Sequence, residues 1–341
     1  MTSIATLGSH CSLQVLKGAK DEGFKTLLIC EKKREKLYRR FPFIDEMIIV
    51  ESFDEFLEKK HQDKLENNNA ILIPHGTLVA QMSTNDIESI RMPVFGNKWI
   101  LRWESDRNLK EKLMQEAGLP VPTPVKDPSE INNLVIVKRQ GAAGGKGYFM
   151  ASSKEEYDAK KSQLVSQGIL SETEPLYIQE YAMGVLAYLQ FFYSPLKDDL
   201  EFFGADQRHE SDIEGLSRIP SGLQMTMNKV SSFNVIGNSP LVLRESLLEK
   251  AYAMGDDFVS AARRLVKPGM NGPFCIEGVY DENAKFTSFE FSARIVAGTN
   301  IYMDGSPYYS LLYGENMSMG KRIAREIKTA DATDQLDKIT T

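Results

Sequence analysis

A glycine-rich segment, residues 138–149, carries the clearest chemical signal in this sequence. It holds four glycines and three cations, and it follows a short apolar run at residues 134–137. Glycine lets backbone N–H groups approach an anion closely, and lysine supplies charge where phosphate groups must be held. A Walker A loop is excluded because Gly147, rather than serine or threonine, follows Lys146. We therefore predict a polyphosphate ligand, held by a loop that joins two strands and closes over it as a lid; a simple hairpin tip is the alternative.

Two apolar runs later in the chain each contain one glutamate. They flank residues 281–285, a turn-forming stretch, and are typical of a β-hairpin. If Asp281 pairs with Phe286, the register places Glu277 opposite Glu290. Two facing carboxylates repel each other unless a cation lies between them, so this pair suits one or two Mg²⁺ ions and a triphosphate. A solvent-facing hairpin with ordinary surface acids is the alternative. Alternation along the strand places Ser288, Ser292 and Arg294 on the face of Glu290, and Phe289 and Phe291 on the other face.

Length and composition limit the possible classes of protein. The chain has 341 residues, of which 42% are hydrophobic and 26% charged, as expected for a globular protein of two or three packed units. The net charge of -6 argues against a nucleic-acid partner. No apolar run is long enough for a signal peptide or a membrane span, which predicts a cytoplasmic protein without a membrane partner. Three widely spaced cysteines without a CxxC pair fit reduced thiols and argue against a zinc site.

The first part of the chain alternates apolar runs with helical patterns. Strands are predicted at residues 4–7, 24–30, 47–50 and 70–74, with helices between them that include residues 54–60. This alternation predicts an open parallel α/β sheet over about the first 95 residues. Ligands of such sheets bind beyond the carboxyl ends of the strands, where Ser9-His10 and His75-Gly76-Thr77 fall. A ligand is therefore predicted at His10, with a turn histidine bonded to backbone as the alternative.

Two further units are predicted beyond this sheet. Ser105 or Asp106 can cap a helix that ends at Gly118, and the proline-rich stretch 119–124 then acts as a stiff connector. The second unit contains a strand ending at Lys138, a helix over 155–165 and a strand over 176–181. The third contains a strand over 186–193, an amphipathic helix over 245–266 and the glutamate hairpin.

In its motifs and their order, the chain resembles the ATP-grasp superfamily. The residues that carry the resemblance are Lys110, Lys138 with its glycine loop, the hinge Tyr177-Ile178-Gln179-Glu180-Tyr181, Glu277 and Glu290-Phe291-Ser292-Ala293-Arg294. The resemblance covers nearly the whole chain and implies a mixed α/β and α+β class, with an ATP-grasp fold behind an N-terminal open parallel α/β domain. It implies a substrate-binding domain over 1–97, a linker helix and lid subdomain over 98–185, and a C-terminal subdomain with the metal site over 186–341.

Within this superfamily the chain is similar to the archaeal PurP family of formate-dependent 5-formaminoimidazole-4-carboxamide ribonucleotide (FAICAR) synthetases. The closer match rests on Ser9-His10-Cys11-Ser12-Leu13-Gln14, Phe95-Gly96-Asn97, Trp103-Glu104-Ser105-Asp106-Arg107, Arg208-His209-Glu210-Ser211, Gly237-Asn238-Ser239-Pro240 and Arg244-Glu245-Ser246. It implies that ATP and formate give formyl phosphate, which the amine of aminoimidazole carboxamide ribonucleotide (AICAR) captures. The products would be FAICAR, ADP and phosphate, in purine (IMP) biosynthesis. We also expect a homo-oligomer.

The resemblance assigns roles residue by residue. ATP would be held by Lys110, Lys138, Gly144, Gly145, Lys146, Gln179, Glu180, Tyr181 and Glu210; AICAR by His10, Thr77 and Asn238; and Mg²⁺ or Mn²⁺ by Glu277 and Glu290, with Arg294 and Lys138 as catalytic residues. Two positions depart from the superfamily pattern. Ser292 stands where many members have an asparagine metal ligand, and Gln179 occupies a hinge position that is often acidic.

Other functions stay open at this point. An ATP-grasp ligase for another carboxylate and amine would use the same ATP and metal residues. His10, Thr77 and Asn238 would then bind a substrate other than AICAR. A non-catalytic paralogue that senses purine nucleotides is a second alternative, although the intact glutamate pair argues against it. A nicotinamide dehydrogenase is weakly supported, because the second and third glycines of its fingerprint are missing after Gly8.

Overall fold

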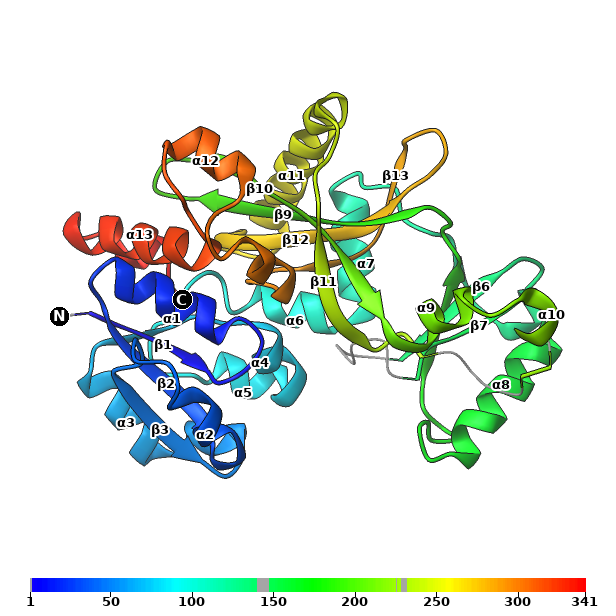
Figure 1. Cartoon of the computed structure of the whole chain (residues 1–341), viewed down its shortest axis with the longest axis horizontal. Coiled ribbons are helices and arrows are strands. Elements are labelled where there is room, and N and C mark those ends of the chain that lie inside the picture. The colour runs from blue at the N-terminus through cyan, green and yellow to red at the C-terminus, as the bar shows by residue number, and fades with distance from the viewer. Residues whose placement is uncertain (1, 140–146, 225, 228–231) are drawn as a thin grey trace.

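Three β-sheets organise the chain in the computed structural model, which describes residues 2–139, 147–224, 226–227 and 232–341 (Figure 1). One four-stranded sheet is parallel, and the other two sheets, of four and five strands, are antiparallel. The predicted mixed α/β and α+β class is therefore confirmed. Within these residues, no helix combines the length and the apolar character that a membrane span needs. Gly144, Gly145 and Lys146, all predicted to hold ATP, lie outside the described residues.

The parallel sheet, with strand order β3-β2-β1-β4, forms the N-terminal unit. Its strands are largely buried, and apolar side chains such as Leu27 and Leu72 fill the core between sheet and helices. The helix predicted over 54–60 is wrong in its bounds. A 3₁₀ turn at Phe53–Leu57 comes first, and the helix begins only after Glu58, whose backbone is extended. The elements of this unit are β1 (Ser3–Leu7), α1 (Ser12–Asp21), β2 (Lys25–Glu31), α2 (Glu35–Tyr38), β3 (Glu46–Val50), α3 (Lys59–Asn67), β4 (Ala70–Leu72), α4 (Gly76–Gln81) and α5 (Thr84–Glu88).

Two short helices, α6 (Ile100–Ser105) and α7 (Arg107–Glu116), connect this unit to the rest of the chain. Asp106, one of the two predicted caps, begins α7: its side chain accepts hydrogen bonds from the backbone N–H groups of Asn108 and Leu109. Helix α7 packs against α11 (Glu245–Leu265) and β13 (Phe286–Ser292). Its inner face is thereby held against the strand that carries Glu290.

The second unit of the chain is an antiparallel four-stranded sheet of order β5-β8-β6-β7, with helix α8 beside it. Ile178 lies in its core with Tyr157 and Leu164 of α8. The two strands predicted to flank the glycine loop are confirmed, since β6 ends at Arg139 and β7 begins at Phe149. The elements are β5 (Pro124–Val125), β6 (Val135–Arg139), β7 (Phe149–Ala151), α8 (Lys154–Ser166) and β8 (Leu176–Glu180).

The five-stranded sheet has the order β11-β10-β9-β12-β13. Helix α11 covers one face, where the rings of Phe191 and Phe258 both stack on that of Phe274. Because side chains alternate along a strand, the other face is free to carry polar groups toward a ligand. The remaining elements are β9 (Val185–Ser194), β10 (Asp199–Glu210), α9 (Ser211–Ser217), α10 (Ser221–Gln224), β11 (Val235–Leu241), β12 (Gly272–Tyr280), α12 (Pro307–Tyr313) and α13 (Met319–Ala332).

The last described segment packs on the first. Helix α13 lies along α1 (Figure 1), and a Cβ on Gly18 would lie 2.2 Å from the backbone of Gly320, so glycine permits the close approach. Backbone hydrogen bonds of 3.0 and 2.9 Å join Val94 and Thr341 in both directions. The N-terminal sheet thus shares a core with residues from the far end of the chain. The domain boundaries after residues 97 and 185 stay predictions.

Candidate active site

The predicted glutamate pair is present in the structure. Glu277 on β12 lies opposite Glu290 on β13 in the antiparallel ladder. The turn proposed for the hairpin is wrong, because Tyr280, rather than Asp281, pairs with Phe286. Asp281 instead closes the turn, with its side chain accepting backbone hydrogen bonds within it. A β-bulge between the turn and the glutamates adds one residue to β13, which shifts the register and restores the predicted pairing.

The bulge also changes which side chains of β13 face the cavity described next. Phe289 and Glu290 are consecutive, yet both line it. Ser288 is fully buried on the other side, where its Oγ lies 3.4 Å from the sulfur of Met114. The predicted faces are therefore wrong for Ser288 and Phe289. They are correct beyond the bulge, for Phe291 in the core and for Ser292 and Arg294 in the cavity.

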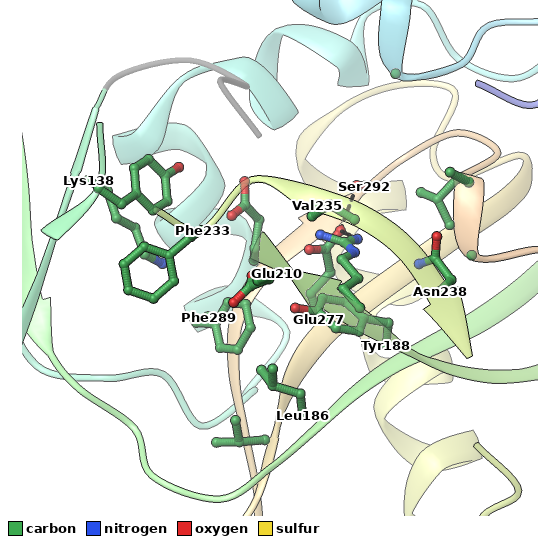
Figure 2. A pocket seen from close by; sticks show the side chains of 18 of the residues that line it. Lys138, Leu186, Tyr188, Glu210, Phe233, Val235, Asn238, Glu277, Phe289 and Ser292 are labelled. Carbon is green, nitrogen blue, oxygen red and sulfur yellow. Dashed lines mark hydrogen bonds and ion pairs between the residues drawn. The ribbon is translucent and has the colours of Figure 1, made fainter. Parts of the chain in front are cut away.

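A cavity of about 660 Å³ lies between the N-terminal unit and the two antiparallel sheets (Figure 2). The predicted site residues that line it are His10, Lys138, Gln179, Tyr181, Glu210, Asn238, Glu277, Glu290 and Arg294. Among the other described site residues, Thr77 and Lys110 do not line the cavity but contact His10 and Glu290, which do. Glu180 is absent from the lining, because it follows Gln179 on one strand and points to the opposite face.

Glu290 is surrounded by cations. Nζ of Lys110 lies 2.5 Å from its Oε1, and the guanidinium of Arg107 lies 3.4 Å from the same oxygen. Burial alone would raise the pKa of Glu290. The charges of Lys110, Arg107 and Lys138 outweigh burial and hold the pKa of this carboxyl well below its usual range. Glu290 is therefore ionised, with buried positive charge on several sides.

Lys138 enters the cavity from β6. The residue is only 4% exposed, and its Nζ lies 5.0 Å from the centre of the Phe289 ring. Burial is the main reason that the pKa of Lys138 falls to about 7; Glu290 opposes the fall, and Arg107 and Lys110 add to it. A bound polyanion would favour the charged ammonium. The position therefore suits contact with phosphate.

Glu277 has its own partners. NH2 of Arg208 lies 2.8 Å from Oε1 of Glu277, and Oγ of Ser292 donates a hydrogen bond of 2.9 Å to the same oxygen. The guanidinium of Arg208 lies 3.8 Å from the centre of the Tyr188 ring, which holds it flat beside the carboxylate. The two glutamates thus face the same cavity but are balanced by separate cations.

The glutamate pair has the chemistry of part of a metal coordination shell. Its carboxylates, with the hydroxyl of Ser292, are hard oxygen ligands of the kind that Mg²⁺ prefers. The described residues contain no cluster of three or more His, Cys, Asp or Glu side chains that could hold a metal on their own. The arrangement therefore fits a divalent ion that completes its shell with water and phosphate oxygens, and it does not fit an all-protein site.

The end of the cavity near Lys138 is mainly apolar, as Figure 2 shows for Leu186, Phe233 and Phe289. Glu210 lies among these groups, and burial raises the pKa of Glu210 to about 7, against the opposing charge of Arg208. Ile136, Val279, Gln179 and Tyr181 also line the cavity. An apolar surface with a few polar groups suits a planar heterocyclic base.

The opposite end is built around His10. Its Nδ1 lies 3.2 Å from Oγ1 of Thr77, and its ring stacks on that of His75 with centroids 5.8 Å apart. A Cβ on Gly76 would lie 2.8 Å from Nε2 of His10, so glycine leaves room for the ring. Burial, helped by nearby arginines, lowers the pKa of His10 to about 4. The ring is therefore neutral at pH 7.

His75 holds this arrangement from behind. Its Nε2 lies 2.8 Å from the carbonyl oxygen of Leu7, and its Nδ1 accepts a hydrogen bond of 3.2 Å from the backbone N–H of Thr77. A carbonyl only accepts and an N–H only donates, so the proton of the neutral ring must sit on Nε2. Burial lowers the pKa of His75 to about 3, which keeps this ring uncharged.

Arg294 reaches the cavity between the two ends. Its NH2 lies 2.8 Å from Oε1 of Glu104, whose other oxygen accepts a hydrogen bond of 2.9 Å from the backbone N–H of Ala293. Nε of Arg294 is buried and has no hydrogen-bond partner among the described residues. The guanidinium as a whole lines the cavity, where it brings positive charge to a ligand.

Comparison with known proteins identifies the family. The chain is 75% identical over 341 residues, 100% of both chains, to the 5-formaminoimidazole-4-carboxamide-1-(beta)-D-ribofuranosyl 5'-monophosphate synthetase of Nitrosopumilus maritimus. It is 48% identical over 340 residues to the protein of the same name from Methanocaldococcus jannaschii, covering 99% of this chain and 94% of the other. The chain belongs to this synthetase family. The similarity to the PurP family inferred from the sequence is therefore confirmed.

Solved structures and family models agree with membership of the synthetase family. The crystal structure of an IMP biosynthesis protein PurP from Thermococcus kodakaraensis matches with a TM-score of 0.80 and 31% identity, over 99% of this chain and 100% of that one. An N5-carboxyaminoimidazole ribonucleotide synthetase, purK, in complex with ADP shares the fold, with a TM-score of 0.69 and 14% identity over 95% of this chain and 76% of that one. Two family models also match: a protein of unknown function (DUF1246) over residues 4–125 and a domain of unknown function (DUF1297) over residues 156–341.

Sequence reasoning did not assign several residues of this candidate site. Arg208 lies within one of the motifs that carried the resemblance, but its contact with Glu277 depends on the strand order, which the sequence did not predict. Alternation along residues 186–193 was a usable signal for Tyr188, which shares a face with Leu186. Arg107 also lies within one of those motifs, but only the packing of α7 on β13 brings it to Glu290.

Proposed function

We propose that this chain is an ATP-dependent ligase that activates formate as formyl phosphate and formylates AICAR to FAICAR, releasing ADP and phosphate in purine biosynthesis. One observation carries the proposal. A single cavity joins Lys138 and the glutamate pair to the hydrogen-bonding groups of His10 and Asn238. Membership of the synthetase family supports this choice of reaction and substrates.

ATP would lie across the charged part of the cavity. Its base would contact Gln179, Tyr181 and Glu210. The glutamate pair would hold Mg²⁺ or Mn²⁺, which neutralises phosphate charge and polarises the transferring group when it is bound. Lys138 would contact the phosphates directly, with Lys110 and the glycine-rich segment as further proposed contacts. Because the buried cations are already in place, they need little rearrangement as charge develops during phosphoryl transfer.

Formate and AICAR would occupy the remainder of the cavity. The guanidinium of Arg294, which lines the cavity, is a suitable donor for an oxygen of formate or of the acyl phosphate. His10 and Asn238 would bind AICAR, and Thr77 would orient the His10 ring through their hydrogen bond. Water destroys an acyl phosphate, so holding the amine acceptor in the same cavity favours transfer over hydrolysis.

The proposal is tested by ADP release from purified protein. With ATP and Mg²⁺ present, formate and AICAR should each give little ADP alone and much more together, and the nucleotide product should gain one formyl group by mass. Repeating the assay with Mn²⁺ after removal of all metal by a chelator shows which divalent ion supports turnover. Glu277→Gln should abolish the joint stimulation, whereas Glu282→Gln, in the exposed hairpin turn, should not.

Two results would overturn parts of the proposal in different ways. Turnover with another carboxylate and amine, while AICAR neither binds nor reacts, would leave an ATP-grasp ligase of other specificity. Tight binding of purine nucleotides with no ADP release under any combination would favour the non-catalytic sensor.

A further inference from the structure

A buried aspartate lies directly behind Asn238. Asp206, on β10, is fully buried and does not line the cavity, whereas Asn238, on β11, does. Oδ2 of Asp206 accepts a hydrogen bond of 2.7 Å from Nδ2 of Asn238, and Oδ1 accepts one of 2.6 Å from Nε2 of Gln190. In Figure 2, Asn238 lies at the end of the view opposite Lys138. Asp206 therefore anchors a side chain that faces the ligand space.

The surroundings of Asp206 fit a carboxylate closely. A Cβ on Gly298 would lie 2.2 Å from Oδ1 of Asp206, so this glycine leaves the room that the carboxylate occupies. Gly298 itself belongs to a 3₁₀ turn, Ala297–Tyr302, and lines the cavity. Burial and the charge of Glu277 raise the pKa of Asp206, and the positive charge of Arg208 and the two amide donors oppose the rise without cancelling it. Both carboxylate oxygens accept a hydrogen bond from an amide NH₂, which is the geometry of a carboxylate.

The contact with Asp206 sets the direction of the Asn238 amide. An ionised carboxylate can only accept hydrogen bonds, so the NH₂ group of Asn238 must be the side that faces it. The amide oxygen, Oδ1, is then the atom left for the cavity. Asparagine alone could present either a donor or an acceptor to a ligand. With Asp206 behind it, only the acceptor is presented.

We propose that Asp206 is a positioning residue that turns the Asn238 amide oxygen into the cavity, so that this end selects a ligand with an N–H donor and disfavours an anionic oxygen in the same place. The inference rests on the proposed function. AICAR can offer the NH₂ of its 4-carboxamide as this donor. The related ribonucleotide with a 4-carboxylate keeps the ring amine but has only oxygens at position 4, so its carboxylate is repelled where AICAR places the carboxamide NH₂ against Oδ1.

The test compares binding of AICAR and of the 4-carboxylate ribonucleotide to the full chain by titration calorimetry. The wild type should prefer AICAR by at least about tenfold, as expected when a buried polar contact is mismatched. Asp206→Asn gives the position an NH₂ of its own, which allows the Asn238 amide to turn round. This variant should lose most of the preference for AICAR over the 4-carboxylate ribonucleotide. In the ADP-release assay, its KM for AICAR should rise, while its KM for ATP should stay within about twofold of the wild type.

Two further variants distinguish an effect on the orientation of the Asn238 amide from a general loss of structure around Asp206. Gln190→Met removes the other amide donor to Asp206 but leaves the contact with Asn238, so the preference for AICAR should persist. The double variant Asp206→Asn, Asn238→Asp exchanges donor and acceptor, and the carboxylate at position 238 again presents an acceptor to the cavity. It should recover a large part of the preference that Asp206→Asn loses.

The outcomes are distinguishable. The inference is overturned if Asp206→Asn keeps the wild-type preference, if it weakens ATP and AICAR alike, or if Gln190→Met loses the preference to the same extent. A double variant that prefers AICAR no more than Asp206→Asn does also counts against a role of Asp206 in orienting the Asn238 amide. If the wild type does not bind AICAR at all, the proposed function fails and this inference fails with it; if the wild type forms FAICAR but the variants behave alike, only the inference fails.

Discussion

Two regions of the cavity, the part that contains the glutamate pair and the end around His10, are built from different interactions. In the part that contains the glutamate pair, charges face charges: Glu290 contacts Lys110, and Glu277 contacts Arg208. At the other end, neutral groups hold one another by hydrogen bonds and stacking, and burial lowers the pKa of His10 to about 4 so that its ring stays uncharged. The region with the glutamate pair therefore offers a ligand charges that are balanced by neighbouring charges. The His10 end offers hydrogen-bonding groups that are held in fixed orientations.

This difference matches the demands of two kinds of ligand. A transferring phosphoryl group spreads negative charge during reaction, and fixed counter-charges in a dry site stabilise it most effectively. A heterocycle with amine and carboxamide groups needs donors and acceptors at defined positions instead. Substitutions in the charged part should therefore reduce turnover, whereas substitutions at the His10 end should reduce affinity for the second substrate.

The largest effect is expected for Glu290→Gln. It removes one of the two carboxylates proposed to hold the metal and leaves Lys110, Arg107 and Lys138 without their shared counter-charge. We expect kcat to fall by at least about 100-fold, the usual scale for loss of a key electrostatic group. ADP release at saturating substrates measures it, with Glu282→Gln as the control. Near-normal kcat at modest metal concentration would contradict the metal assignment.

The next effect concerns pH and Lys138. Burial lowers the pKa of Lys138 to about 7 in the free protein, and bound phosphate should raise it again. Below pH 7 the ammonium is already charged, so its contribution to ATP affinity is fully present. Above pH 7 a proton must be taken up on binding, so affinity should fall by up to about tenfold per pH unit. Calorimetry between pH 7.5 and pH 9 measures the slope, which Lys138→Met should remove; equal slopes in both proteins would exclude this origin.

At the neutral end, Gly76→Ala should affect AICAR alone. The added Cβ would lie 2.8 Å from Nε2 of His10 and displace the ring from its place on His75. AICAR affinity should weaken by about tenfold while ATP affinity stays unchanged, because only hydrogen bonds at this end are lost. Gly215→Ala, at a site with open space, is the matched control. A parallel loss of ATP affinity would show that the two ends are not independent.

The smallest effect is expected for Ser292→Ala. Its hydroxyl donates to Glu277 and is proposed as a third oxygen ligand of the metal, so its loss should raise the metal concentration for half-maximal activity by about threefold. Ser288→Ala is a control from the same strand, since the bulge turns Ser288 away from the cavity. If both substitutions raise the metal concentration for half-maximal activity equally, the different orientation of the two serines on either side of the bulge has no effect on metal binding.

Local patterns predicted much of this molecule. The alternation of strands and helices gave the parallel sheet, and the hairpin arithmetic placed Glu277 opposite Glu290. The bulge was not predictable, because an extra residue in one strand leaves alternation on either side intact and only the partner strand reveals it. Long-range pairs such as Arg208 with Glu277 and Lys110 with Glu290 were also beyond reach, since they depend on strand order and on helix packing rather than on neighbours in sequence.

The packing of α13 on α1 has a consequence for the order in which the protein folds. Residues 1–97 emerge first during synthesis, but the core beneath α1 contains Ile323 and Ile327 of α13, and Val94 bonds to Thr341. The N-terminal unit therefore cannot complete its core until almost all of the described chain has been synthesised. Until then, the face of α1 that packs on α13 stays uncovered. A fragment that ends at residue 97 should be prone to aggregate, and co-expression of the missing segment is the natural means of rescuing it.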